Sequence, residues 1–259
     1  MPDLNDIAAD VDARASEQPG LPEVAVIIPA RDEGENLVAL IRQIEAALGS
    51  TAHEVIVVDD GSCDDTATII GQIQPDHPGL RLLRHSHPSG QSAALRSGVL
   101  HARAGIIVTI DGDGQNDPAY IPAMLELLAG GGPGLGIVAG QREKRKDGTL
   151  KTLASRFANR LRGAILKDGT RDTGCGLKVL PRALFLRLPF FDGYHRYLPA
   201  LVLREGRTVA HLTVIDRPRR FGRSKYGILD RGLRGALDLI GVWWLCRRMR
   251  RVEIEYPHD

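Results

Sequence analysis

The chain has 259 residues, of which 43% are hydrophobic and 25% are charged, so it can bury the core of one large α/β domain or of two small ones. This composition excludes a fibrous or a disordered protein as the main architecture. Cys63, Cys175 and Cys246 are an odd count at wide spacing, which argues against a disulfide framework and a thiolate zinc site and favours a reducing compartment.

The net charge of +2 hides an asymmetry between the two halves of the chain. Residues 1–140 contain 7 Lys and Arg against 20 Asp and Glu, whereas residues 141–259 contain 27 against 12. We therefore expect the halves to meet different partners. The acidic residues 1–22 lack the basic start and apolar run of a signal peptide, so we expect a flexible segment that does not direct export. We also expect no membrane span, because no run of 18 apolar residues occurs.

Short apolar runs alternate with segments of helical periodicity in the first half. Strands are predicted at residues 24–29, 54–58, 80–83 and 106–110, and helices at 37–48, from about 65, and at 91–102. This order predicts an α/β fold with a mainly parallel sheet and helices on both of its faces. Ligands of such sheets bind beyond the carboxyl ends of the strands.

The second half is basic and less regular. It predicts a helix over residues 150–166, a Gly-rich turn at 173–176, a strand at 177–180, a helix after Pro181 and a basic loop from Asp216. The last element predicted is an amphipathic helix from about Ile228 to Arg250. Its apolar stripe consists of Leu229, Leu233, Leu237, Ile240 and Trp244.

The clearest sign of chemistry is the sequence Asp111-Gly-Asp113-Gly-Gln115, directly after the strand at 106–110. Two carboxylates so close in an irregular turn can hold one Mg²⁺ or Mn²⁺ together with substrate phosphates, and the Gln115 amide oxygen can be a further ligand. The alternatives are a turn that ends the strand, or a calcium loop. The calcium loop lacks its bidentate glutamate, because Pro122 stands at that position.

Acidic residues also follow two other predicted strands. Asp60 follows the strand at 54–58, and Glu33 follows the strand at 24–29. Each alone is explained by turn chemistry and by helix capping, for which Asp64 or Asp65 is suited. Three acidic strand ends on one edge favour a nucleotide site, because clustered carboxylates repel one another unless a cation or hydrogen-bond donors lie between them.

Other features of the sequence give only weak indications of a different function. His85 and His87 could bind a metal, but a pair without carboxylate partners is more often structural. The basic second half could serve solubility or bind nucleic acid, yet no nucleic-acid motif accompanies it, and we expect an anionic lipid surface instead. The motifs of P-loop NTPases, dinucleotide dehydrogenases and α/β-hydrolases do not occur.

Several segments in order carry a family resemblance over residues 23–228. They are VIIPARDEGEN, EVIVVDDGSCDDT, GQSAALRSGVLHARAG, VTIDGDGQNDP, GQREKR, SRFANRL, DTGCGLKV and RRFGRSKYG. This series resembles the family-2 glycosyltransferases of GT-A fold, and among them the dolichol-phosphate mannosyltransferase-like polyprenyl-phosphate sugar transferases. The resemblance implies an inverting, metal-dependent enzyme that moves a sugar from a nucleoside diphosphate sugar to a polyprenyl phosphate.

The resemblance also implies roles for individual residues. The nucleotide set is Pro29, Arg31, Glu33, Asp60 and Asp111. The set that holds Mg²⁺ or Mn²⁺ is Asp111, Asp113 and Gln115. The acceptor-phosphate set is Arg142, Ser155, Arg219, Ser224 and Lys225. The residues expected to act in catalysis are Asp113, Arg142, Arg219 and Lys225.

Two departures from the family pattern bear on these expectations. Arg31 stands where relatives often have an aromatic residue near the base, so the base stays open, with a UDP-sugar preferred weakly over GDP-mannose. Gly112 and Gly114 replace Ala and Leu of many relatives, which loosens the metal loop without removing a ligand. The sugar, the prenyl length and the oligomeric state are not determined by the sequence.

A phosphate acceptor needs little assistance from catalytic side chains. Its second pKa is about 6, so it is already anionic at neutral pH and needs no strong general base. Two alternatives stay open: a transferase of the same fold that uses a hydroxyl acceptor, and a nucleotide-binding module without turnover.

These observations predict three parts: a flexible segment over residues 1–22, a GT-A catalytic domain over 23–227, and an amphipathic helix with a tail over 228–259. Trp243, Trp244 and the arginines at 247–251 predict that this helix lies on an anionic membrane surface, which makes the enzyme peripheral at the cytoplasmic face. The alternative is a helix packed on the domain or on a second subunit.

Overall fold

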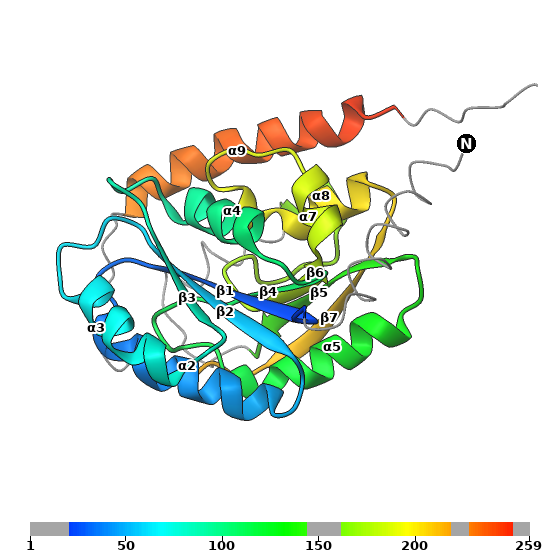
Figure 1. The fold of residues 1–259 in the computed structure, drawn as a ribbon. Helices are drawn as coiled ribbons and strands as arrows, with labels where there is room; N and C mark the ends of the chain where they lie inside the picture. The colour runs from blue at the N-terminus through cyan, green and yellow to red at the C-terminus, as the bar shows by residue number, and fades with distance from the viewer. Residues whose placement is uncertain (1–20, 144–161, 219–227, 251–259) are drawn as a thin grey trace, which may run out of the picture.

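The computed structural model describes residues 21–143, 162–218 and 228–250, with side chains of the last helix described from Gly235 onward. A seven-stranded sheet in the order β3-β2-β1-β4-β6-β5-β7 forms the centre of the described residues (Figure 1). The strands are β1 (Val24–Ala30), β2 (His53–Asp59), β3 (Leu80–Arg84), β4 (Ile106–Thr109), β5 (Leu135–Arg142), β6 (Lys178–Pro181) and β7 (Thr208–Val214).

Helices cover both faces of this sheet (Figure 1). The helices are α2 (Gly34–Leu48), α3 (Thr66–Ile73), α4 (Gln91–His101), α5 (Ile121–Gly130), α7 (Arg182–Arg187), α8 (Leu198–Arg204) and α9 (Ile228–Arg248). Shorter 3-10 turns are η1 (Gln74–Asp76), η2 (Pro118–Tyr120) and η3 (Tyr194–Arg196). One core cluster joins the sheet to α2, α3 and α5, and the other joins it to α4, α7, α8 and α9. The predicted α/β architecture is thus confirmed.

The first four strands form the parallel part that the sequence predicts. β1 pairs in parallel with β2 and with β4, and β2 pairs in parallel with β3. Both faces of β1 are covered, and its residues Val24–Ile28 are at most 3% exposed. Continuous β-branched runs suit such strands, because every second side chain enters one of two apolar layers.

The second half reverses one strand. β6 runs antiparallel to β4, with Lys178 opposite Thr109, and antiparallel to β5, which pairs in parallel with β7. The carboxyl ends of β1, β2, β4, β5 and β7 therefore lie at the same edge as the start of β6. This C-terminal edge of the sheet receives the loops that carry the acidic motifs.

Some predictions fall outside the described residues. Only 162–166 of the basic helix predicted over 150–166 is described, and it is helical there. Residues 1–20 and most of the basic loop after Asp216 are likewise outside the described ranges. Among the described helices, none combines the length and the hydropathy that a bilayer span requires.

Candidate active site

The C-terminal edge of the sheet gathers the predicted site residues that the structure describes. Pro29 lies in β1, and Arg31 and Glu33 lie in the loop from β1 to α2. Asp60 follows β2, the metal motif over 111–115 follows β4, and Arg142 ends β5. Ser155, Arg219, Ser224 and Lys225 lie outside the described residues.

The loop after β1 is tied to the loop after β2. The Asp32 amide donates to Ser62 Oγ at 2.9 Å, and the Cys63 amide donates to Asp32 Oδ1 at 2.8 Å. Asp32 has a φ of 53°, a left-handed conformation that an Asp tolerates better than most residues. In the same contact the Glu33 amide donates to Thr66 Oγ1 at 3.1 Å. These bonds fix the two loops that carry the predicted nucleotide residues.

Asp60 is buried and accepts three hydrogen bonds. Its Oδ1 accepts from the Ser89 amide at 2.8 Å and lies 2.7 Å from His85 Nδ1, and its Oδ2 accepts from the Gly90 amide at 2.8 Å. Burial alone would raise the pKa of Asp60, but these bonds lower it below the ordinary value. The carboxylate therefore stays ionised and holds the chain immediately before α4.

Both ring nitrogens of His85 have hydrogen-bond partners within the protein, and one of these partners is a carboxylate. Its Nδ1 lies against Asp60, as above, and its Nε2 lies 2.9 Å from Ser97 Oγ on α4. His87 is exposed and lies next to Ser86. Among the described residues, no group of three or more His, Cys, Asp and Glu side chains is placed to hold a metal ion by itself.

The metal motif brings two carboxylates close together. Burial raises the pKa of Asp111 to about 6, and the nearby charge of Asp113 adds to the shift. Gln91 Nε2 donates to Asp111 Oδ1 at 2.8 Å, and the backbone N–H of Gln115 donates to Asp113 Oδ1 at 3.1 Å. A divalent cation would favour the ionised form of both groups, and oxygen ligands are those that Mg²⁺ and Mn²⁺ prefer. The donor set therefore fits such a cation if substrate oxygens complete it.

The loop before β6 packs directly against this motif. A Cβ on Gly176 would lie 2.3–2.5 Å from the carboxylate atoms of Asp111, so only glycine lets the backbone come this close. Thr109 Oγ1 donates to the Gly176 carbonyl at 2.6 Å. Lys178 is 4% exposed and donates to the Cys175 carbonyl, and burial lowers the pKa of this lysine. Cys175 is buried as well.

Arg142 is held by two carboxylates that the sequence did not single out as site residues. It donates through Nε and Nη2 to Asp172, the latter bond at 2.9 Å, and through Nη1 to Asp216 at 3.0 Å. The hydrogen bonds to Asp172 raise the pKa of Arg142 above its ordinary value. A bound phosphate would share or replace these partners, so the predicted phosphate role of Arg142 requires an exchange of contacts.

Other residues of the site also escaped the sequence analysis. Asp216 links Arg142 to Asn116, whose Nδ2 donates to Asp216 Oδ1 at 3.2 Å. Lys178 and His195 line a small cavity beside Asp111. Asp172 precedes the Gly-rich turn and Asp216 begins the basic loop. These positions are the only feature of the sequence that could have indicated a role in the site.

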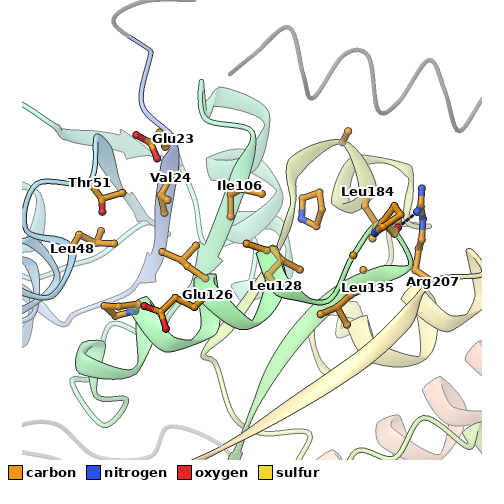
Figure 2. A pocket seen from close by; sticks show the side chains of 18 of the residues that line it. Glu23, Val24, Leu48, Thr51, Ile106, Glu126, Leu128, Leu135, Leu184 and Arg207 are labelled. Carbon is orange, nitrogen blue, oxygen red and sulfur yellow. Dashed lines mark hydrogen bonds between the residues drawn. The ribbon is translucent and has the colours of Figure 1, made fainter. Parts of the chain in front are cut away.

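A separate cavity of about 720 Å³ lies at the opposite edge of the sheet (Figure 2). It is lined at the first residues of β1, β4 and β5 by Val24, Ile106 and Leu135, and by Leu128 of α5 and Leu184 of α7. None of the predicted site residues lines it. Its size is therefore no argument for placing the chemistry there, and we locate the site by its charged groups instead.

Comparison with known families identifies the chain. The family described as "Glycosyl transferase family 2" matches residues 25–189. The chain belongs to this family. The matched range of this glycosyltransferase contains the loops after β1, β2 and β4, which carry Glu33, Asp60 and Asp111.

Relatives of this family 2 glycosyltransferase span much of its length. Dodecaprenyl-phosphate galacturonate synthase of Rhizobium johnstonii is 34% identical over 237 residues, which cover 88% of this chain and 69% of the relative. Undecaprenyl-phosphate 4-deoxy-4-formamido-L-arabinose transferase of Klebsiella pneumoniae is 29% identical over 216 residues, which cover 82% of this chain and 64% of the relative. The chain thus spans about two thirds of the length of these curated relatives.

Solved structures agree on the fold. Glucosyl-3-phosphoglycerate synthase from Mycobacterium tuberculosis, in complex with Mn²⁺, UDP and glucosyl-3-phosphoglycerate, aligns with a TM-score of 0.65 at 20% identity over 92% of this chain and 83% of that one. A mannosyltransferase from Pyrobaculum calidifontis, in complex with GDP-Man and Mn²⁺, aligns with a TM-score of 0.65 at 21% identity over 96% and 73%. The family 2 chain therefore has the GT-A fold that its motifs predict.

Proposed function

We propose that the protein transfers a sugar from a nucleoside diphosphate sugar to a polyprenyl phosphate. The observation that carries this proposal is the convergence of Asp60, Asp111, Asp113 and Arg142 at one edge of a family 2 fold. Relatives at 34% and 29% identity are named for transfer to dodecaprenyl and undecaprenyl phosphate. A lipid phosphate is the acceptor class that these names support for this chain.

The donor binds along the loops after β1, β2 and β4. Arg31, Glu33 and Asp60, with Pro29 at the end of β1, surround the nucleotide, and Asp111 and Asp113 with Gln115 hold Mg²⁺ or Mn²⁺ at the diphosphate. A bound divalent cation supplies charge stabilisation of the departing diphosphate. We favour a UDP-sugar over GDP-mannose as the first donor to test.

The acceptor phosphate binds among cationic and hydroxyl groups of the second half. They are Arg142, Ser155, Arg219, Ser224 and Lys225. Because the phosphate oxygen is already anionic at neutral pH, these residues position it and balance its charge rather than remove a proton. Attack from the face opposite the diphosphate inverts the anomeric carbon.

Helix α9 provides the means of reaching a lipid substrate. Its Val242 is 1% exposed and packs on the domain, whereas Leu237 and Ile240 are each 63% exposed and Trp244 is 52% exposed. Arg248 stacks over Trp244, with its guanidinium carbon 5.6 Å from the ring centroid. An outward apolar stripe bordered by arginines suits an anionic membrane surface. We place the enzyme there as a peripheral protein, at the cytoplasmic face.

The deciding experiment incubates the protein with radiolabelled nucleotide sugars, polyprenyl phosphate and Mn²⁺, followed by organic extraction. We expect label in the organic phase, and none when the lipid phosphate is replaced by the corresponding polyprenol. Label in a water-soluble glycoside would support a hydroxyl acceptor, and nucleotide binding without transferred label would support a binding module; either result contradicts the proposal.

A further inference from the structure

His195 is held in η3, the short turn that precedes α8. It lies in η3 between Tyr194, which is fully buried, and Tyr197, which is 6% exposed. The Tyr194 ring packs edge-on against Phe185 and Phe190, with ring centroids 5.6 and 5.2 Å apart. This aromatic packing holds the short turn that carries the imidazole against the core.

Ser92 of α4 determines which ring nitrogen of His195 carries the proton. Ser92 Oγ accepts from the Gly193 amide at 2.9 Å and lies 2.7 Å from His195 Nδ1. The arrangement that gives every atom a partner has the Ser92 hydroxyl donating to Nδ1. The proton of the neutral ring is then on Nε2.

The imidazole is also kept neutral by its surroundings. Burial lowers the pKa of His195 to about 3, and the charges of Lys178 and Arg196 act in the same direction. At neutral pH the ring is therefore a hydrogen-bond donor at Nε2, with no lone pair there to accept a proton.

His195 is one of the residues that line the small cavity beside the metal motif. Gln91, Asp111, Lys178 and His195 are among the groups that line it, and its volume is about 10 Å³. Such a volume holds about one oxygen-sized group. Within the described residues, the hydrogen bond of His195 to Ser92 is made by Nδ1, and Nε2 has no protein partner. A free donor, a fixed tautomer and a cavity for a single polar group thus coincide next to Asp111.

We infer that His195 Nε2 donates a hydrogen bond to one oxygen of the transferred sugar and so helps to select which sugar is used. This inference rests on the proposed function. It assigns to His195 the role of a specificity-determining donor and not that of a general base, and it assigns to Ser92 the role of a positioning residue that keeps the donor on Nε2.

The test compares two substitutions that differ in one N–H group. His195→Gln keeps a side-chain N–H near the place of Nε2, whereas His195→Leu has a similar size and no donor. His101→Gln is the matched control, because His101 is exposed at the far end of α4. Calorimetry with Mn²⁺ gives the affinities for UDP, UDP-glucose, UDP-galactose, UDP-glucuronic acid, GDP and GDP-mannose.

We expect the wild-type protein to discriminate between these sugars by about tenfold or more, as the loss of a buried hydrogen bond requires. In His195→Leu the discrimination should fall to about threefold or less while the UDP and GDP affinities stay within about twofold, and His195→Gln should retain most of it. Ser92→Ala, which frees the tautomer, should lie between the two.

The inference would be overturned by unchanged discrimination in His195→Leu, by equal behaviour of the Leu and Gln variants, or by a parallel loss of UDP and GDP affinity. A wild-type protein that binds all the sugars alike would do so as well. The proposed function fails in a different way, through the absence of lipid-soluble label from the wild-type protein, whereas these binding measurements need no turnover.

Discussion

At the scale of single residues, the candidate site contains a pair of carboxylates that repel each other and an arginine that is already paired with two others. Asp111 and Asp113 raise the energy of their joint ionisation, while Asp172 and Asp216 occupy the guanidinium of Arg142. A cation would offer a partner to Asp111 and Asp113, and a phosphate group would offer one to Arg142. Ligand binding would therefore replace contacts within the protein by contacts with the ligand. Substitution of a single carboxylate can measure its contribution.

Asp113→Asn should reduce turnover by at least about a hundredfold, because it removes a charged ligand of the cation that would neutralise the diphosphate. Its melting temperature should stay close to that of the wild-type protein, since Asp113 is only partly buried. Steady-state transfer assays and thermal denaturation measure the two quantities, with Asp76→Asn, at an exposed position in η1, as the control. Full activity of the wild-type protein in EDTA would contradict this prediction.

Asp60→Asn should destabilise the fold by about 1–3 kcal/mol at pH 7, because an amide nitrogen would face the donors at Ser89, Gly90 or His85. The folded-state pKa of Asp60 is below its unfolded value of 3.8, so the ionised carboxylate contributes stability above that pH. The wild-type advantage should be constant from pH 7 to about pH 5 and decline below about pH 4.

Urea unfolding of wild type, Asp60→Asn and Asp76→Asn at several pH values tests this dependence. An advantage that grows as the pH falls would show that the carboxylate is not stabilised in its ionised form.

The sequence predicted the residues whose position follows from a strand end. Asp60 and Asp111 each come directly after a buried apolar run, so the parallel topology alone brings them to one edge. Asp172 and Asp216 could not be found in this way, because their meeting at Arg142 depends on how two loops distant in sequence fold over β5. His195 was also missed, since a lone histidine near aromatic residues has no spacing that marks it.

At the scale of elements, β6 brings a further loop to the candidate site. It runs against its neighbours, so the loop that enters it arrives at the same edge as the loops that leave β1, β2 and β4. β7 escaped prediction because most of its residues are only partly buried and its neighbour β5 lies far away in sequence. The strand periodicity is weak where one face of a strand is half solvated.

Gly176→Ala tests how closely this loop must approach Asp111. The added methyl would lie within 2.5 Å of all three carboxylate atoms, so we expect Asp111 to be displaced and turnover to fall at least about tenfold. Gly71→Ala in α3 is the matched control, because its methyl would meet no atom within 4 Å. Equal transfer rates for the two variants would mean that the contact does not position Asp111.

At the scale of the whole molecule, α9 has one face packed on the domain and one face exposed to solvent. Tyr197 donates from its hydroxyl to the Gly235 carbonyl at 3.2 Å, and Val242 and Leu239 join the core beside α8. The opposite side presents Leu237, Ile240 and Trp244 to solvent. The alternative that α9 packs on the domain is therefore true of one face and leaves the other available.

Replacing Leu237 and Ile240 together by Gln should abolish sedimentation with anionic liposomes without unfolding the protein, because both side chains are 63% exposed. Leu127→Gln is the control, since Leu127 is 37% exposed on α5 at the other face of the sheet. Binding by the wild-type protein should weaken as salt is raised.

Unchanged sedimentation of the double variant would contradict a membrane role for this face. A wild-type dimer in analytical ultracentrifugation that the double variant converts to a monomer would instead identify the stripe as a contact between two copies.

The cavity at the starts of the strands has a practical consequence for the design of ligands. Val24 lines it, and Ala30 at the other end of β1 is about 20 Å away for a strand of this length. A small molecule that fills the cavity would therefore leave the nucleotide loops free. It would not compete with the sugar donor, and it should raise the melting temperature in a thermal shift assay whether or not UDP is bound.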